Sequence, residues 1–445
     1  MTPPFTPHLL FGLDPMWTSA AILALTYALV IAGWINRAIV ALIGALVVIA
    51  IGALDQNAAI AGINWDTIGL LTGMMILVSI ARRSGVFQFL AIWSAQRANA
   101  SPAGILVMLQ LTTAVLSALL NNVSTVLLIA PVTLVIAEEL DLPAFPFLFA
   151  EIFASNIGGT ATLIGDPPNI LIGSATGLDF NAFLVNLAPV VVVILAVQML
   201  MVHALWGRKL RATPESRALV MGMNAPGMIT DRQLLWQSIA VIGLALAAFV
   251  FAAPLHLEPA TVALAGAAVL MLLDNWRQGG ARQSENVHKT FADVEWITIF
   301  FIMALFVLVH AVEVSGLLGL LANRLVAFTG GNAVAAGGVI LWSSAGLSAV
   351  LDNIPFVATM IPLIKSAAPA YGGAARIEPL WWCLALGACL GGNGTLVGAA
   401  ANLTVAGVAE RNAVHMSFVR YLAYGLPMTI VSIAICQLYV WLRYF

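Results

Sequence analysis

Residues 155–169 read SNIGGTATLIGDPPN, within a stretch that is otherwise apolar enough to cross a membrane. This run cannot form one continuous helix, because Pro167 and Pro168 lack the backbone N–H and clash with the preceding turn. Gly158 and Gly159 add permissive backbone. Residues 387–402, GACLGGNGTLVGAAAN, carry a similar glycine-rich interruption. Irregular backbone at membrane depth occurs only where it is buried in protein or lines a cavity, so the two runs predict two broken helices around one cavity.

The composition indicates a polytopic helical membrane protein. Of 445 residues, 61% are hydrophobic and 9% are charged, and the mean hydropathy is +1.00. A globular protein has roughly 25% charged residues, so this composition excludes a chain of soluble domains, and it also excludes disorder. The net charge of −2 gives no sign of a nucleic-acid partner, and the three cysteines form neither a disulfide framework nor a zinc site. We expect no metal and no cofactor.

Apolar runs of about 20 residues predict ten crossings. They lie near 17–35, 38–54, 65–81, 145–175, 183–206, 233–253, 259–274, 296–312, 379–408 and 421–441. The crossings 145–175 and 379–408 are the interrupted ones. Two further stretches, 103–137 and 335–368, are each split by a polar tip. We predict that both are re-entrant hairpins, although a pair of ordinary crossings would preserve the same sidedness.

The distribution of basic residues sets the predicted orientation. With the N-terminus outside, the outer segments hold only four of the 18 Lys and Arg residues, namely Arg324, Lys365, Arg376 and Arg443. Basic residues concentrate in cytoplasmic loops, so this layout is favoured. An even number of crossings then puts both termini outside, in an inner-membrane protein with a cytoplasmic linker at 207–232. No Lys or Arg falls at the predicted midplane depth.

The two halves, 1–206 and 233–445, repeat one another. Pairs at an offset of 231 are Trp65 and Trp296, Ser84-Gly85 and Ser315-Gly316, and Asn121-Asn122 and Asp352-Asn353, while Asn169 and Asn402 share an offset of 233. Five crossings in each half put the halves in opposite orientations. Inverted repeats with paired broken helices are typical of secondary transporters, with the site at the repeat interface. We therefore predict an all-α polytopic membrane fold of two inverted repeats, with two re-entrant hairpins and two broken helices.

Helix ends at the two breaks and the two hairpin tips predict the binding site. Free N–H groups at a half-helix start suit oxygens and anions, and free carbonyls at a half-helix end suit cations. The predicted substrate-binding residues are Asn121, Asn122, Ser124, Thr125, Asn156, Gly158, Gly159, Thr160, Asn353, Gly392, Asn393 and Thr395. The residues predicted to shape the breaks are Pro167, Pro168, Asn169 and Asn402.

Three acids are candidates for ion coupling. Asp166 lies in the first break and Asp352 at the second hairpin tip, whereas their repeat equivalents are Ala399 and Asn121. Ionisable groups inside spans are costly and often functional, and one acid that alternates between protonated and charged forms is what a proton-coupled carrier needs. Glu151, in the first interrupted span, is the third candidate. Helix capping by the two aspartates and structural pairing of the glutamate are the alternatives.

The runs 155–169 and 387–402 resemble the paired signatures of the ArsB/NhaD permease group of the ion transporter superfamily. They are most similar to its melanosomal P-protein-like branch, and the likeness extends over 60–441. The resemblance implies a carrier of arsenite or antimonite, of sodium and protons, or of anions. In the wider superfamily it implies a scaffold domain and an elevator-like movement. The tips, 122–125 and 352–355, depart from the Ser-Asn-Thr of divalent-anion symporters, which argues against sodium-coupled dicarboxylate uptake.

We therefore predict a carrier rather than an enzyme, with proton-coupled efflux of arsenite or antimonite. Neutral trihydroxy arsenic needs hydrogen-bond donors and acceptors but no counter-charge. A sodium/proton antiporter, with Asp166 and Asp352 as sodium ligands, and an anion or dicarboxylate carrier are the alternatives. An intramembrane aspartyl protease would need these two acids a few ångströms apart. The chain has no P-loop, so its energy comes from an ion gradient or a soluble ATPase partner. For the oligomeric state in the lipid bilayer, we also consider a homodimer.

Overall fold

The computed structural model describes residues 9, 12–251 and 257–445, and all regular structure in them is helical. Nine of the described helices are long and apolar enough to cross a membrane, or ten if the bent pair α17 and α18 is one span. The predicted all-α polytopic fold is therefore confirmed. The predicted outer position of residues 1–8 lies outside the described residues.

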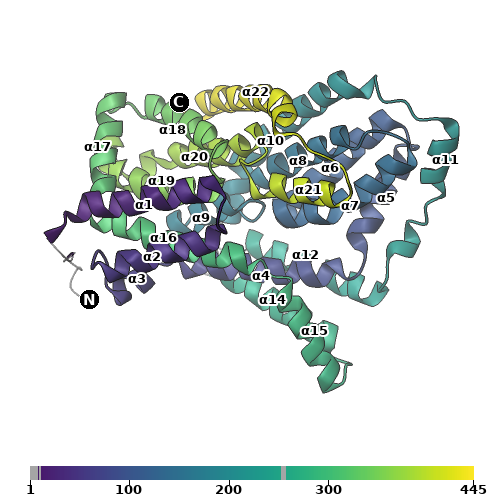
Figure 1. Cartoon of the computed structure of the whole chain (residues 1–445), viewed down its shortest axis with the longest axis horizontal. Helices are drawn as coiled ribbons and strands as arrows, with labels where there is room; N and C mark the ends of the chain where they lie inside the picture. The colour runs from purple at the N-terminus through teal and green to yellow at the C-terminus, as the bar shows by residue number, and fades with distance from the viewer. Residues whose placement is uncertain (1–8, 10–11, 252–256) are drawn as a thin grey trace.

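The first half contains the two hairpin arms α6 and α7 and the broken helix α8–α9 (Figure 1). Its helices are α1 (Pro15–Ala32), α2 (Arg37–Ala50), α3 (Gln56–Ala61), α4 (Trp65–Arg82), α5 (Val86–Arg97), α6 (Pro102–Leu119), α7 (Asn122–Glu139), α8 (Phe145–Thr160), α9 (Pro167–Thr176) and α10 (Phe180–Val202), which ends in the π-turn η2 (His203–Gly207). We call α6 and α7 hairpin one, and residues 161–166 break one.

A linker with the short helix α11 (Pro214–Gly222) and the turn η3 (Pro226–Met228) joins the halves. The second half contains α12 (Arg232–Val250), α14 (Pro259–Asn275), α15 (Gly280–Ala292), α16 (Trp296–Val314), α17 (Leu317–Thr329), α18 (Ala333–Ser348), α19 (Asn353–Ala367), η4 (Ala368–Tyr371), η5 (Ala374–Arg376), α20 (Glu378–Gly391), η6 (Gly392–Gly394), α21 (Ala400–Arg411) and α22 (Phe418–Tyr444). We call α18 and α19 hairpin two, and residues 392–399 break two.

Helices of the two halves begin at matching positions. The starts of α4, α5, α6 and α7 each lie 231 residues before those of α16, α17, α18 and α19, and α9 starts 233 residues before α21. Contacts match as well: α4 packs on α14 as α16 packs on α2, and α7 packs on α21 as α19 packs on α9. Helices at matching positions therefore make matching contacts, and each half supplies helices that pack on the other.

Glycine allows the closest helix packing in both halves. A Cβ on Gly158 of α8 would lie 2.2 Å from the carbonyl oxygen of Ala114 in α6, and a Cβ on Gly391 of α20 would lie 2.5 Å from that of Ala345 in α18. Hydrogen bonds reinforce the two pairs, because Ser117 donates to Ser155 O and Ser348 to Ala388 O, both at 2.6 Å. The first hairpin arm and the first part of the broken helix are thus held backbone to backbone.

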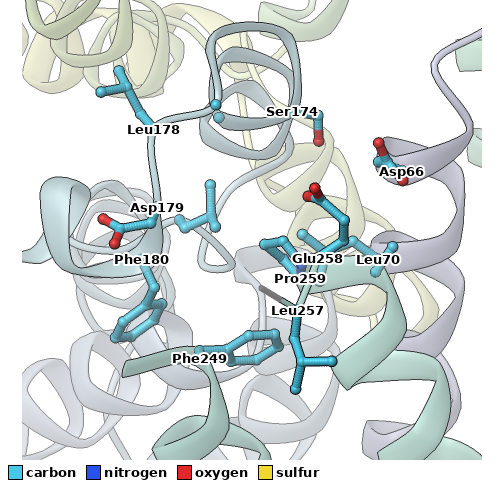
Figure 2. Close-up of a pocket in the computed structure, with 14 residues that line it drawn as sticks. Asp66, Leu70, Ser174, Leu178, Asp179, Phe180, Phe249, Leu257, Glu258 and Pro259 are labelled. Atoms are coloured by element: carbon cyan, nitrogen blue, oxygen red, sulfur yellow. The ribbon is translucent and has the colours of Figure 1, made fainter. Parts of the chain in front are cut away.

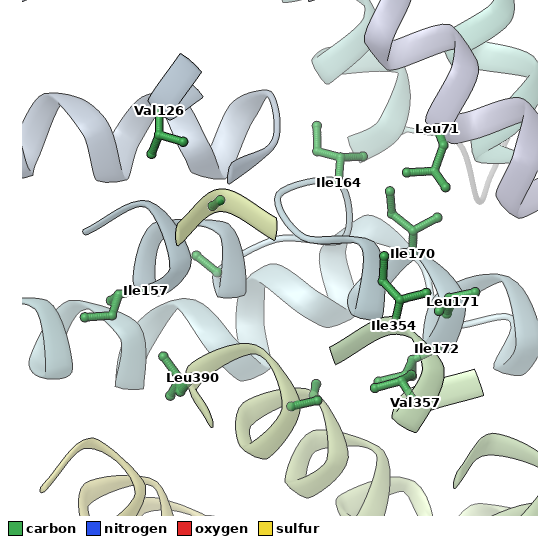
Figure 3. Close-up of a cluster of buried hydrophobic side chains, with 14 of the residues drawn as sticks. Leu71, Val126, Ile157, Ile164, Ile170, Leu171, Ile172, Ile354, Val357 and Leu390 are labelled. Carbon is green, nitrogen blue, oxygen red and sulfur yellow. The ribbon is translucent and has the colours of Figure 1, made fainter. Parts of the chain in front are cut away.

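The hydrophobic core surrounds the breaks. Every residue of α8 is buried, as is the stretch 380–394 in α20 and η6. Figure 3 shows Ile170 and Leu171 of α9 beside Ile354 of α19, with Ile157 of α8 and Leu390 of α20 in the same cluster. Irregular backbone needs such enclosure in a membrane protein. The nine candidate spans include α6, α7 and α19, whereas α18 qualifies only together with α17, from which it is bent by 117°. Helix length thus permits three of the four hairpin arms to cross, and re-entrance remains a prediction.

Candidate functional site

The tips of both hairpins contact break one. The backbone N–H of Asn122 donates to Gly165 O at 3.1 Å, and its Nδ2 donates to Asn156 Oδ1 at 3.1 Å. At the tip of hairpin two, Asn353 Nδ2 donates to Asp166 Oδ1 at 3.3 Å. The structure therefore brings together residues from the two predicted hairpin tips and the predicted break.

Reciprocal hydrogen bonds join the two breaks. Asn156 Nδ2 donates to Asn402 Oδ1 at 2.9 Å and to Asn393 Oδ1 at 2.9 Å. In the opposite direction, Cys389 Sγ donates to Asn169 Oδ1 at 3.5 Å. Asn156 and Cys389 are equivalent positions at an offset of 233, and so are Asn169 and Asn402. The same contact is thus made twice, with a thiol in one copy where the other has an amide.

Asn169 and Asn402 also fold their own breaks. Asn169 Nδ2 donates to the carbonyls of Thr160 and Thr162 at 3.1 and 2.8 Å. Asn402 Nδ2 donates to the carbonyls of Gly392 and Thr395 at 2.8 and 2.9 Å. Carbonyls that a broken helix leaves without helical partners are satisfied in this way. Both side chains lie at the positions that the sequence analysis assigned to shaping the breaks.

Asp166 is buried at 1% exposure, and its Oδ2 has no hydrogen-bond partner among the described residues. It occupies the N-cap position of α9 but makes no capping hydrogen bond, which removes capping as its role. The reason is local, because Pro167 and Pro168 supply no N–H in the first turn. A buried, unsatisfied carboxylate oxygen is expensive unless a proton or cation completes it.

Break two has the opposite chemistry. The N-cap of α21 is Ala399, and the helix then opens with Ala400 and Ala401, so its first turn has no acid and no proline. The first N–H groups of a helix have no partner within the helix, and they favour oxygen atoms and negative charge. Break one thus suits a proton or cation, whereas break two suits the oxygens of a solute.

Asp352 has a cationic partner that the sequence analysis missed. Arg37 forms an ion pair with it, and Arg37 also donates to Thr298 Oγ1 at 3.0 Å. The basic-residue layout left Arg37 among the residues of the cytoplasmic segments, and no Lys or Arg was expected at midplane depth. The sequence analysis therefore did not predict this long-range contact. Asp352 makes no capping hydrogen bond to α19, so capping is not its role either.

Glu151 is fully buried and lies away from the two breaks' hydrogen bonds. One oxygen accepts from Thr133 of α7, and Oε2 has no partner among the described residues. The equivalent positions in the second half are Leu384 and Ile364, both fully buried. The pair is therefore a polar feature of one half only.

Several predicted binding hydroxyls are committed to backbone carbonyls. Thr125 donates to Asn121 O at 2.7 Å and Thr160 to Asn156 O at 2.7 Å, while Thr395 donates to Ala349 O. Ser124 instead lines a small cavity of about 60 Å³. Gly159 and Gly392 serve close packing, since a Cβ on either would meet the backbone of Gly165 or Gly398 within 2.9 Å. The threonine hydroxyls, like the asparagine side chains of the two preceding networks, are therefore already hydrogen-bonded, and the carboxylate oxygen Asp166 Oδ2 is a buried acceptor without a partner among the described residues.

Two larger cavities approach the breaks. One of about 300 Å³ is lined by Asp66, Asp179, Glu258 and Ser174 and reaches Leu163 of break one (Figure 2). Asp179 accepts from Ala182 N at 2.8 Å and so caps α10. The other cavity, about 620 Å³, is lined by residues that include Arg37, Val123, Thr298 and Ala400. The first cavity reaches the starts of α4, α10 and α14, and the second cavity reaches the starts of α2, α7, α16 and α21.

Comparison with known proteins identifies relatives along nearly the whole chain. The model of the citrate transporter family, CitMHS, matches residues 27–387. An uncharacterized transporter of Mycobacterium bovis is 42% identical over 96% of this chain and 98% of its own length. The P protein of Sus scrofa is 32% identical over 95% of this chain, which spans 59% of that protein.

Solved structures share the fold at low identity. The YdaH transporter of Alcanivorax borkumensis has a TM-score of 0.61 at 14% identity, with 96% of this chain and 98% of that one covered. MtrF of Neisseria gonorrhoeae, described as one of a class of antimetabolite efflux pumps, has a TM-score of 0.58 at 12% identity, with 98% of this chain and 96% of that one covered. The sequence relatives support the predicted likeness to P proteins, whereas the matching family model is that of citrate transporters, so the assignment to the ArsB/NhaD group stays a prediction.

Proposed function

Since the chain belongs to the CitMHS family of membrane transporters, we propose that it is a proton-coupled secondary carrier in which Asp166 takes up the coupling proton. The observation that carries this proposal is the geometry of Asp166. Its carboxylate is 1% exposed, one oxygen faces the amide of Asn353, and the other oxygen has no partner among the described residues. Such a carboxylate can bind a proton from one side of the membrane and release it to the other side.

The two breaks divide the work. The coupling ion occupies the acidic break one, and the solute uses the free N–H groups of α21 at break two. Asn156 connects them, because its amide donates to both Asn393 and Asn402 of the second half. Binding of the coupling ion at break one thereby affects break two through the Asn156 side chain, which contacts the second half.

For the solute we propose arsenite or antimonite as the first candidate. Break two offers helix N–H groups and no charged side chain, which fits a small neutral oxyacid. Citrate is the second candidate, because the family is described as one of citrate transporters and Arg37 supplies one cation close to hairpin two. Sodium is the alternative coupling ion, with Asp166 as a ligand. The family contains carriers rather than enzymes, so we do not retain an aspartyl protease.

We further propose that the halves are inverted repeats that expose the site alternately through the two cavities. The cavity beside Asp66 and Glu258 then opens outward, and the one beside Arg37 and Ala400 opens to the cytoplasm. This assignment follows from the basic-residue layout, which also puts the chain in the inner membrane with 207–232 in the cytoplasm. A homodimer and a soluble ATPase partner remain predictions from the sequence.

Transport into everted vesicles tests the proposal. Arsenite, sodium and citrate are supplied side by side, each with and without an imposed proton gradient, to wild type and to Asp166→Asn. We expect one solute to move only with the gradient, and the variant to lose that dependence. Gradient-independent movement of every solute by wild type, or unchanged coupling in the variant, contradicts the proposal. Proton-driven sodium movement alone would select the antiporter.

A further inference from the structure

The two hairpin tips begin their second helices differently. Asn121 caps α7 by accepting from the N–H of Ser124 at 2.7 Å. At the equivalent place in hairpin two, Asp352 is the N-cap of α19 but makes no capping bond. The residue equivalent to Ser124 is Pro355, which has no N–H to donate. The proline therefore leaves the Asp352 carboxylate without a capping donor at that position and available for another partner.

That partner is Arg37, at the first position of α2. The guanidinium is itself held in place, because it donates to Thr298 Oγ1 at 3.0 Å and stacks 5.1 Å from the ring centre of Phe301, both in α16. The side chains of the ion pair are 25% and 11% exposed. Partly buried, oriented pairs are held more firmly than surface pairs, which contribute little.

A second contact holds the same turn of hairpin two. The hydroxyl of Tyr27 in α1 donates to Pro355 O at 2.9 Å and lies 2.9 Å from Thr359 Oγ1. The start of α19 is therefore held by two contacts, one from Tyr27 of α1 and one from Arg37 of α2. No equivalent ion pair holds the tip of hairpin one within the described residues, since Asn121 is committed to its own helix.

The residue after Asp352 is Asn353, whose amide donates to Asp166. We propose that Arg37 is a positioning residue of the coupling site: through its ion pair with Asp352 it holds the Asn353 amide on the Asp166 carboxylate. The connection runs through direct contacts from α16 to α2, to the tip of hairpin two, and to α9. The inference rests on the proposed role of Asp166, and it adds a residue that touches neither proton nor solute.

The charges near Asp166 give a second reason why Asp352 is paired with Arg37. Asp352 and Cys389 of α20 are the titratable groups close to Asp166 on the elements packed around it. An unpaired Asp352 would add a second negative charge beside Asp166 and favour the protonated acid. Arg37 balances that charge, so Asp166 remains the one net acid at the breaks and Asn353 can stabilise its charged form.

Labelling by a hydrophobic carbodiimide tests this positioning without knowledge of the solute. The reagent attacks protonated carboxyl groups, and peptide mass spectrometry measures the modification of Asp166 separately from that of Glu151. The purified full-length protein is labelled at an alkaline pH where wild-type Asp166 reacts at only about one hundredth of its maximal rate, so that a rise in its protonated fraction can be measured. We expect Arg37→Gln to raise Asp166 labelling several-fold, up to about tenfold for loss of one hydrogen bond to a charged group. Labelling of Glu151 should not change.

A matched control is the ion pair of Arg83 with Asp274, whose side chains are 27% and 11% exposed. Arg83→Gln should leave Asp166 labelling at the wild-type level. Asn353→Ala should also raise labelling, by no more than Arg37→Gln does, and the double variant should match Arg37→Gln, because the Asn353 donor is already lost there. Additive effects in the double variant would mean that Arg37 acts by charge at a distance, and they would overturn the proposal.

Two further outcomes also decide. Equal effects of Arg37→Gln and Arg83→Gln would make the pair a general structural brace and sink the inference. If Arg37→Gln does not yield a monodisperse protein, Asp352→Asn replaces it and must reproduce the raised labelling. The transport assay with Asp166→Asn stands apart from these measurements, so the coupling role and the positioning role can fail separately.

Discussion

At the scale of single residues, Asp166 of break one and Asp352 at the tip of hairpin two have different environments. Each has one oxygen without a hydrogen-bond partner among the described residues, but the other oxygen of Asp352 pairs with Arg37, whereas that of Asp166 accepts from the neutral amide of Asn353. The sequence placed both acids on irregular backbone and could not rank them, because the ion pair joins residues 315 positions apart. A side chain already neutralised by arginine is a poor proton carrier, since protonation would leave the arginine unpaired.

We therefore predict that Asp166→Asn abolishes gradient-driven transport, whereas Asp352→Asn retains it with altered ion dependence. Both variants should insert normally, because each replaces a carboxylate by an amide of equal size. Counterflow exchange needs no net proton transfer and should survive in Asp166→Asn better than net efflux does. Net efflux and exchange, measured in the same vesicles, provide the comparison. Full pH-dependent efflux by Asp166→Asn would transfer the coupling role to Glu151.

The pairing of Glu151 with Thr133 gives a stability prediction. Thr133→Val removes the donor that the described residues provide to the fully buried carboxyl group of Glu151, and it leaves both oxygens without partners in that part of the chain. An unsatisfied buried acceptor costs about 1–3 kcal/mol, so the melting temperature in detergent should fall. Adding Glu151→Leu, which copies Leu384 of the second half, should recover most of the loss. A Thr133→Val protein as stable as wild type would show that the hydrogen bond contributes nothing to stability.

At the scale of elements, glycine decides how the broken helices pack. We predict that Gly158→Ala and Gly391→Ala each destabilise the protein by about 1–3 kcal/mol, the usual cost of overpacking, because the new Cβ meets a backbone carbonyl. Gly243→Ala in α12 is the matched control, since nothing lies within 4 Å of its Cβ. Thermal melts of the three variants in one detergent compare them. Unchanged melting of Gly158→Ala would mean that α6 and α8 separate at little cost.

The elements themselves were largely predictable from sequence. Prolines and glycines interrupt apolar runs for steric reasons that act locally, so the breaks after residue 160 and residue 391 were predicted where the structure has them. The helices α5 and α17 were missed as elements, although both follow a Ser-Gly turn in which Gly85 and Gly316 have φ of 81° and 88°. That signal was present in the sequence but was used only to align the halves.

Side-chain partners across the site were not predictable. Asn156 reaches Asn402, and Cys389 reaches Asn169, over more than 200 residues of sequence. A repeat can show that two positions are equivalent, but it cannot show that each contacts the other half. It also gave no role to Cys389, because an isolated buried cysteine most often belongs to the core.

At the scale of the whole molecule, the last prediction concerns orientation. If the halves are inverted, the linker 207–232 and Phe445 lie on opposite sides of the membrane, and the basic-residue layout puts the linker on the cytoplasmic side. We predict that an impermeant thiol reagent added to intact cells labels a cysteine placed at Phe445 and does not label one placed at Arg211. The three native cysteines are buried, so they add little background. Disruption of the cells should expose Arg211→Cys to the reagent. Labelling of Arg211→Cys from outside would reverse the assignment of both cavities. If Phe445→Cys and Arg211→Cys are both protected in intact cells, the second half has an even number of crossings, and halves with an even number of crossings are not inverted, which would end the inverted-repeat proposal.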